Sequence, residues 1–307
     1  MRLLDIRGAQ VQHPTGDPRF AVMQAFPSAF SAEESDPFLM CDHYGPTVSK
    51  GAVADPDEFP VGWHPHRGMD ICSYIISGTG RHADSLGNRG TFPTPGVQWI
   101  SVGSGIEHAE GGGTAAGEVL EGFQIWINVP AGRKMDDPSY GTSAEPLPLL
   151  SPSAGVGLRV VSGRPGGDGG AAGPFKTSTP VQMVDIALEG GASYTHVVDP
   201  EELDNCLVYI YKGDGVLQGE PIRMHEAARL DASDPTARGV RLEAGAAGLA
   251  AIVFAGKRLN EPVAWRGPIV MNTDVELQRA FHEYRSGVFL RKKADWDYRL
   301  WAAFPQE

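Results

Sequence analysis

Four side chains able to bind a metal ion stand in two closely spaced pairs in the first half of the chain. His64 and His66 lie two residues apart, and His108 and Glu110 repeat that spacing. Because successive side chains of a β-strand alternate between its faces, each pair projects from one face if its segment is extended. Two such strands facing each other would offer three imidazole nitrogens and one carboxylate to a common point. The spacing therefore predicts one metal site built from these four residues.

The predicted ligand set, three nitrogens and one oxygen, suits a single divalent transition ion per chain. We expect iron(II), while nickel, copper, cobalt, manganese and zinc remain open. Four protein ligands leave two positions of an octahedron free for water, dioxygen or a chelating substrate oxygen. Free positions of this kind are typical of a reactive site rather than of a closed structural one.

Two further polar residues are candidates for supporting roles or for contact with a substrate. Asp70 lies four residues beyond His66, where a continuous strand would turn its carboxylate to the same side. It is expected to accept a hydrogen bond from an imidazole N–H, with direct ligation as the alternative. Gln124 is an amide in an apolar run, where it would contact substrate or metal-bound water, or make an ordinary cross-strand hydrogen bond. The other histidines are interpreted as structural or exposed: His13, His43, His82, His196, His225 and His282.

The elements that must hold these residues are short strands. With 39 glycines and 24 prolines, the chain consists of apolar runs of four to eight residues between turn residues, which predicts an all-β fold. The segment from Arg81 to Gly90 predicts a hairpin, with a glycine and an asparagine at its tip. One helix is expected near the end of the chain, beginning with a capping box of Thr273 and Glu276 and ending at Gly287.

Length and composition predict two domains. A chain of 307 residues that is 41% hydrophobic can bury a core in each. A polar, proline-rich stretch at residues 136–152 is expected to link a metal-binding domain, residues 1–135, to a metal-free domain, residues 153–307, that carries the terminal helix. The segment from Gly163 to Pro174 is expected to be a mobile surface loop, with a lid as the alternative.

Charge and composition argue against several classes of partner. Lys and Arg total 26 against 38 Asp and Glu, so the net charge is −12, which disfavours nucleic acid and anionic membranes. Cys41, Cys72 and Cys206 lack CxxC spacing, and no apolar run has the length of a secretory signal or a membrane span. We therefore expect a cytoplasmic protein. The absence of heptads and of a long apolar patch favours a monomer.

Six motifs together resemble the pirin family of bicupins. HPHRGMDICSYIISG, DSLGNRG, PGVQWISVGSGIEHAE and GFQIWINVP follow one another in the family's order and spacing, with PFLMCDHYGP (residues 37–46) before them and GPIVMNT (residues 267–273) after them. The resemblance implies two cupin barrels, each a double-stranded β-helix or jelly roll, packed face to face with metal only in the first. It places the ligands on His64, His66, His108 and Glu110. The chain departs from the family at Asp70, where pirins often carry glutamate.

The resemblance also implies an activity, because some pirins resemble flavonol 2,3-dioxygenases that open the quercetin ring with dioxygen. In this hypothesis Glu110 is both a ligand and the catalytic base that takes the proton of the flavonol 3-hydroxyl. The alternative is a redox-sensitive metal-binding regulator that acts through a protein partner, such as a transcription factor or a metabolic enzyme. Sugar isomerisation of the cupin kind would need a phosphate-binding basic cluster, for which only Arg67, Arg81 and Arg89 lie near in sequence.

Overall fold

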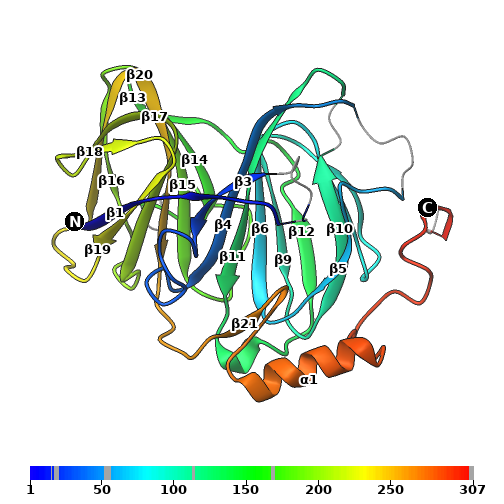
Figure 1. The fold of residues 1–307 in the computed structure, drawn as a ribbon. Coiled ribbons are helices and arrows are strands. Elements are labelled where there is room, and N and C mark those ends of the chain that lie inside the picture. Colours follow the sequence, from blue (N-terminus) through cyan, green and yellow to red (C-terminus); the bar gives the residue numbers. More distant parts are fainter. Residues whose placement is uncertain (15, 17–20, 52–56, 113–114, 167–169, 304–307) are drawn as a thin grey trace. The chain divides into compact units, whose positions relative to one another are not determined.

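Nearly all the regular structure of the chain is β-sheet. The structure is a computed structural model that describes every residue except 15, 17–20, 52–56, 113–114, 167–169 and 304–307 (Figure 1). Among the described residues there is one α-helix, α1 (Asp274–Arg285), beside short 3-10 turns at Ala131–Arg133 and Trp301–Ala303. The prediction of an all-β chain with a short C-terminal helix is therefore confirmed. None of the helices in the described ranges has the length and hydrophobicity needed to cross a membrane.

The chain forms two compact units, and each combines two separate stretches of sequence. The N-barrel unit consists of Tyr44–Pro146 and Glu261–Glu307, and the C-barrel unit of Met1–His43 and Leu147–Asn260. The chain leaves the C-barrel unit after His43, within strand β4 (Phe38–Val48). It returns to that unit after Pro146, inside the predicted linker. This division differs from the predicted one. The first 43 residues, predicted in the metal-binding domain, belong to the C-barrel unit, and the terminal helix, predicted in the metal-free domain, belongs to the N-barrel unit.

The N-barrel unit holds two antiparallel sheets. One has the order β5-β10-β7-β8, and the other includes the run β12-β9-β6-β11. Their strands are β5 (Val61–His66), β6 (Met69–Ser77), β7 (Gly80–Asp84), β8 (Arg89–Phe92), β9 (Gly96–Ser101), β10 (Ile106–Gly112), β11 (Val119–Asn128) and β12 (Ser139–Thr142), and a small hairpin of β21 (Ala264–Arg266) and β22 (Ile269–Met271) leads into α1. The pairing of β7 with β8 confirms the hairpin predicted from Arg81 to Gly90.

The C-barrel unit holds a sheet of nine strands in the order β1-β19-β17-β20-β15-β14-β13, with β16 on β20 and β18 on β17. The strands are β1 (Arg2–Gly8), β13 (Leu150–Ser153), β14 (Val156–Ser162), β15 (Val181–Leu188), β16 (Ser193–Val197), β17 (Asn205–Leu217), β18 (Glu220–Arg223), β19 (Glu226–Asp231) and β20 (Gly239–Gly256), and β2 (Gln10–Gln12) and β3 (Val22–Phe26) precede β4. β1 joins through its pairing with β19 (Figure 1). A cluster of buried aliphatic residues, including Val184, Val208 and Leu242, forms the core.

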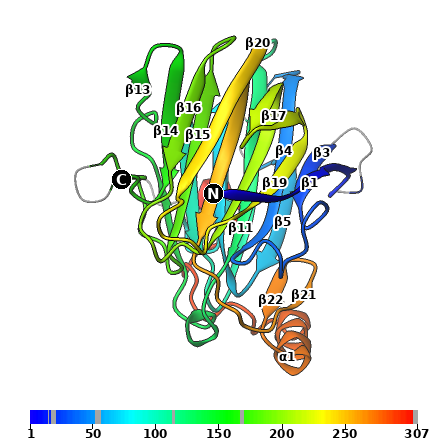
Figure 2. The ribbon, with the colours of Figure 1, turned by 90° about the vertical axis from the view of Figure 1, so that its left-hand side faces the viewer.

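One buried arginine explains why the terminal helix belongs to the N-barrel unit. Arg67 directly follows His66, is 2% exposed, and forms an ion pair of 2.7 Å with Glu283 of α1. Its other guanidinium nitrogens donate to the carbonyl oxygens of Ser104, at 2.7 Å, and Phe289, at 2.8 Å. The helix lies against the β21–β22 hairpin (Figure 2). The helix start is the predicted capping box, in which Thr273 and Glu276 bond each other's backbone N–H.

Residues 294–301, which we call the C-terminal strap, form a second group of contacts with the strands of the N-barrel unit. The hydroxyl of Tyr298 donates to Glu107 at 2.8 Å, and Arg299 forms an ion pair with the same carboxylate at 2.7 Å. Tyr298 also packs against Trp63 of β5, with ring centroids 5.4 Å apart. Because Glu107 precedes His108 and Trp63 precedes His64, the strap contacts the faces of β5 and β10 opposite to those that carry the histidines.

The glycine-rich segment predicted to be a mobile loop joins β14 to β15. Its two ends approach each other, since the N–H of Gly173 donates to the carbonyl oxygen of Gly163 at 2.8 Å. Residues 167–169 of this segment lie outside the described residues. Whether the segment acts as a loop or a lid stays a prediction.

His196, a buried histidine of the C-barrel unit, makes stability depend on pH. His196 on β16 is 2% exposed, its Nε2 lies 2.8 Å from the amide oxygen of Gln182, and burial lowers its pKa to about 4. The unfolded chain binds a proton near pH 6.5, where the folded chain does not, so stability falls as the pH drops from 6.5 to 4. We expect this residue to account for about 3 kcal/mol of that loss.

Urea denaturation at several pH values tests this. His196→Gln should make the decline in stability between pH 6.5 and 4 shallower by about that amount. An unaltered slope in His196→Gln would contradict the assignment.

Candidate metal centre

Three of the four predicted ligands lie close together in the N-barrel unit. β5 and β10 pair antiparallel, with His64 directly opposite His108 and His66 opposite Ile106. The three imidazoles touch one another, with ring centroids 4.4 to 4.8 Å apart. One ring nitrogen from each lies within 4.8 Å of the others. Among the described residues, these three histidines are the cluster of His, Cys, Asp or Glu side chains that could hold a metal ion.

Hydrogen bonding orients His64 so that its Nε2 faces the cluster. Its Nδ1 lies 2.7 Å from the carbonyl oxygen of Gly62, which requires a proton on Nδ1 and leaves the lone pair on Nε2. That Nε2 lies 3.0 Å from Nε2 of His108. Two nitrogens that each bind one metal at about 2.1 Å, at right angles, lie about 3 Å apart. The spacing of these two nitrogens therefore fits two neighbouring ligands of one ion.

Burial keeps the inner two histidines neutral. Loss of solvation, with the nearby charge of His64, lowers the pKa of His66 and of His108 well below the usual range. The Pro268 carbonyl weakly opposes this at His66, yet neither ring nitrogen of His66 meets hydrogen-bond geometry with any described residue. Neutral imidazoles with buried, unpartnered nitrogens are the form in which histidine binds metals. These residues fit a metal ion.

Glu110 lies at the edge of this cluster. Its Oε1 is 4.0 Å from Nε2 of His108, and the carboxylate is 15% exposed while His108 is fully buried. Oε1 accepts a hydrogen bond of 2.6 Å from the amide of Gln124. The structure thus brings Glu110 beside the histidines, with its nearer oxygen bonded to an amide.

Gln124 belongs to a row of polar side chains that crosses three strands. Ser73 on β6 lies directly opposite both Gln124 on β11 and Gln98 on β9, so all three face Glu110. The Ser73 hydroxyl donates to the Gln124 carbonyl oxygen at 2.6 Å, and the Gln98 amide lies 3.4 Å from Oε2 of Glu110. Ser73 and Gln98 were not predicted. Both are polar residues in apolar strands, which is the feature that singled out Gln124.

Asp70 lies elsewhere. It stands three residues from Ser73 on β6, so its side chain lies on the other face of the sheet, where its carboxylate accepts a hydrogen bond of 3.3 Å from the Trp99 indole. The argument from spacing fails because the chain is not continuous strand between His66 and Asp70. Gly68 has a φ of +85°, which ends β5 and resets the alternation of β6.

Gly68 is itself required for the turn behind His66. A Cβ at this position would lie 1.9 Å from the carbonyl oxygen of Val270. We expect Gly68→Ala to cost at least about 2 kcal/mol of unfolding free energy and to weaken metal binding, because the strain acts on His66 through Arg67. Urea denaturation measures the cost. Gly267→Ala is the matched control, since Gly267 also has a positive φ, +55°, but its Cβ would meet nothing within 4 Å; equal costs would contradict a role for the close contact.

A histidine and an aspartate that were not predicted from the sequence adjoin the cluster as a bonded pair. His82 and Asp84 on β7 lie opposite Glu110 and His108 respectively, and are fully buried. His82 Nε2 lies 2.9 Å from the Asp84 carboxylate, and its ring is 5.6 Å from that of His108. The interpretation of His82 as merely structural or exposed overlooks its spacing of two residues from Asp84, the same signal that marked the other pairs.

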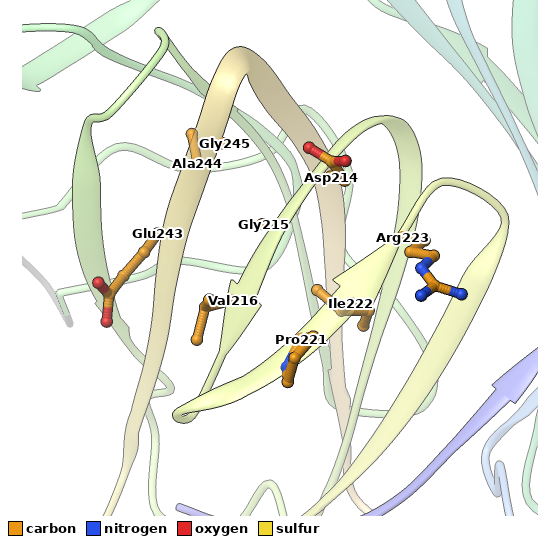
Figure 3. Close-up of a pocket in the computed structure, with 9 residues that line it drawn as sticks. All are labelled: Asp214, Gly215, Val216, Pro221, Ile222, Arg223, Glu243, Ala244 and Gly245. Atoms are coloured by element: carbon orange, nitrogen blue, oxygen red, sulfur yellow. The ribbon is translucent and has the colours of Figure 1, made fainter.

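The C-barrel unit has a surface pocket of a different character. It measures about 300 Å³ and lies among β17, β18 and β20 (Figure 3). Its charged residues are Asp214, Arg223 and Glu243, and no histidine or cysteine lines it. The pocket therefore lacks the ligand types found in the N-barrel unit.

Comparison with known proteins finds similarity along most of the chain. The Pirin family model matches residues 19–127, and the Pirin C-terminal cupin domain matches residues 183–290. This chain belongs to the pirin family. A relative in Pseudomonas aeruginosa, named "Putative quercetin 2,3-dioxygenase PA3240", is 33% identical, covering 94% of this chain and 98% of the relative. The two cupin domains of a bicupin are thus established for this pirin.

Two solved structures resemble this pirin. Quercetin 2,3-dioxygenase from Acinetobacter baumannii is 28% identical with a TM-score of 0.79, covering 94% of this chain and 98% of that one. The bacterial pirin YhhW from Escherichia coli, solved in complex with nickel(II), is 18% identical with a TM-score of 0.59, covering 83% and 99%. The second likeness concerns the fold alone.

Removing one imidazole from this pirin tests the centre. We expect His64→Ala to lower bound metal from about one equivalent to near zero, because two neutral imidazoles and a carboxylate held by an amide bind far more weakly than the full set. Elemental analysis after gel filtration measures the content. His282→Ala, on the exposed face of α1, is the control, and one retained equivalent in His64→Ala would rule out the predicted ligand.

Proposed function

We propose that this pirin is a metal-dependent dioxygenase that cleaves flavonols in the manner of quercetin 2,3-dioxygenase, with His64, His66, His108 and Glu110 as the metal-binding set. The observation that carries the proposal is the asymmetry of the site. His66 and His108 are buried, whereas His64 and the carboxylate of Glu110 are partly exposed. A small molecule would reach the centre from the side of Glu110. The names of the relatives support the same chemistry.

A divalent transition ion bound there would supply Lewis acidity toward a coordinated hydroxyl and redox chemistry toward dioxygen. The three imidazoles would hold it. The lowered pKa values of His66 and His108 keep these two rings neutral, so binding a cation displaces no proton from either of them.

Glu110 is suited to accept the proton of the flavonol 3-hydroxyl. Its Oε1 is held by Gln124 at 2.6 Å, while the contacts of Oε2 with the described residues are the longer ones of 3.4 Å with Ser73 and Gln98. One oxygen is therefore fixed and the other is available to a donor. A carboxylate held in this way keeps its orientation as the proton arrives, which is what general base catalysis requires.

The direct test is an aerobic assay of the iron-, nickel- or copper-loaded protein with quercetin. We expect the flavonol absorbance to fall and carbon monoxide to be released. Glu110→Gln should lower kcat by about 100-fold or more, since it removes the base, and the exposed Glu118→Gln should match the wild type. Persistence of the absorbance band with every metal would rule out the dioxygenase.

A further inference from the structure

Two buried ring nitrogens near the metal centre could form a hydrogen bond with each other, one as donor and the other as acceptor. Nδ1 of His82 and Nδ1 of His108 are both inaccessible to solvent, and neither meets hydrogen-bond geometry with any described residue. The two rings are neighbours, with centroids 5.6 Å apart and planes inclined by 60°. Two imidazoles joined by an N–H···N hydrogen bond of about 3 Å have centres about 5 Å apart. The observed separation of the ring centres, 5.6 Å, is close to that value.

His82 is held in a fixed orientation by two neighbours. Its ring stacks on Tyr140, with centroids 4.2 Å apart and planes 11° from parallel. Its Nε2 lies 2.9 Å from Oδ2 of Asp84, and that carboxylate also accepts hydrogen bonds from the N–H groups of Leu86 and Asn88. A carboxylate surrounded by donors acts as an acceptor, so the proton between the pair resides on Nε2 of His82. The lone pair of neutral His82 is then on Nδ1.

His108 needs the opposite arrangement. Its Nε2 faces His64 at 3.0 Å and is the nitrogen turned toward the cluster. When Nε2 of a neutral imidazole binds a metal, the proton is on Nδ1. Metal-binding histidines usually donate this second N–H to a carboxylate or a carbonyl oxygen. Nδ1 of His108 bonds to no oxygen of the described residues, and the neighbouring ring of His82 offers a buried, unpartnered Nδ1 as acceptor.

We propose that Asp84, His82 and His108 form one chain of hydrogen bonds in the metal-loaded protein, in which His108 donates from Nδ1 to His82 and His82 donates to Asp84. His82 is a positioning residue. It fixes the tautomer and the ring orientation of His108, and Asp84 and Tyr140 in turn fix His82. This inference rests on the proposed metal centre but not on turnover of quercetin.

A pair of amide substitutions at His82 separates positioning from mere packing. His82→Gln places an amide near the position of Nε2, which preserves a donor to Asp84 and removes the acceptor for His108. His82→Asn places its amide oxygen near the position of Nδ1, which preserves that acceptor and removes the donor to Asp84. We expect zinc affinity, measured by chelator competition, to fall 10- to 100-fold in His82→Gln and to stay much closer to the wild type in His82→Asn.

Nuclear magnetic resonance of the zinc-loaded protein supplies a second measurement. With histidine rings labelled with ¹⁵N, the Nδ1 proton of His108 should give a slowly exchanging, hydrogen-bonded signal in the wild type and in His82→Asn. It should be lost by exchange in His82→Gln. The substitution His196→Gln, at a buried histidine of the C-barrel unit, should change neither the zinc affinity nor this signal.

The outcomes are distinct. Wild-type zinc affinity in His82→Gln, an unchanged His108 signal, or a larger loss in His82→Asn than in His82→Gln would each overturn the proposal. A wild-type protein that binds no zinc would overturn it together with the metal centre. A protein that binds zinc as described but leaves quercetin intact with every redox metal would refute only the dioxygenase.

Discussion

The pairing of β5 with β10 is the constraint on which the centre depends. It places His64 directly opposite His108 and holds their Nε2 atoms 3.0 Å apart. Backbone hydrogen bonds fix this register, and a slip of one residue in either strand would turn both ligands of that strand to the wrong face. The structure supports the pair from both sides. His82 and Asp84 adjoin it on the inner face of β7, and the strap contacts Glu107 and Trp63 on the outer face.

The two units show how one architecture accommodates different interiors. The core of the C-barrel unit is aliphatic, and its buried His196 lies 2.8 Å from the amide oxygen of Gln182. In the N-barrel unit a polar row of Gln98, Ser73 and Gln124 crosses three strands to meet Glu110. Buried donors in such a row need acceptors, and the carboxylate accepts from the amides of Gln124 and Gln98 and the hydroxyl of Ser73. Function therefore depends on which inward positions are polar and not on the fold itself.

The sequence predicts local features of this protein well, because they follow from short spacing. The alternation of strand residues grouped His64, His66 and His108 on one face, short apolar runs between turn residues predicted the all-β fold, and a local start signal predicted the capping box before α1. The same rule failed for Asp70, because the positive φ of Gly68 interrupts the alternation. The lesson is that spacing predicts a shared face only within an unbroken strand.

Long-range contacts set the limits of that prediction. The ion pair of Arg67 with Glu283 joins residues 216 positions apart, and β1 pairs with β19 at the far side of the chain. Neither contact leaves a local pattern in the sequence. With boundaries predicted at residues 135 and 153, each end of the chain was therefore placed in the domain nearest to it in sequence. The row that orients Glu110 was missed in part for the same reason, since it requires the register of β9, β6 and β11.

The interleaving of the two units has a consequence for the order in which the protein is made. A ribosome releases every segment of the C-barrel unit once residue 260 has emerged, whereas the N-barrel unit still lacks α1 and the strap. Until the last segment is synthesised, Arg67 has no carboxylate from α1 and Glu107 has no partner from the strap. The strands that carry the histidines come early in translation, but their supports come last. The N-barrel unit is therefore completed after the C-barrel unit, and the strands of its centre gain their supports from α1 and the strap only then.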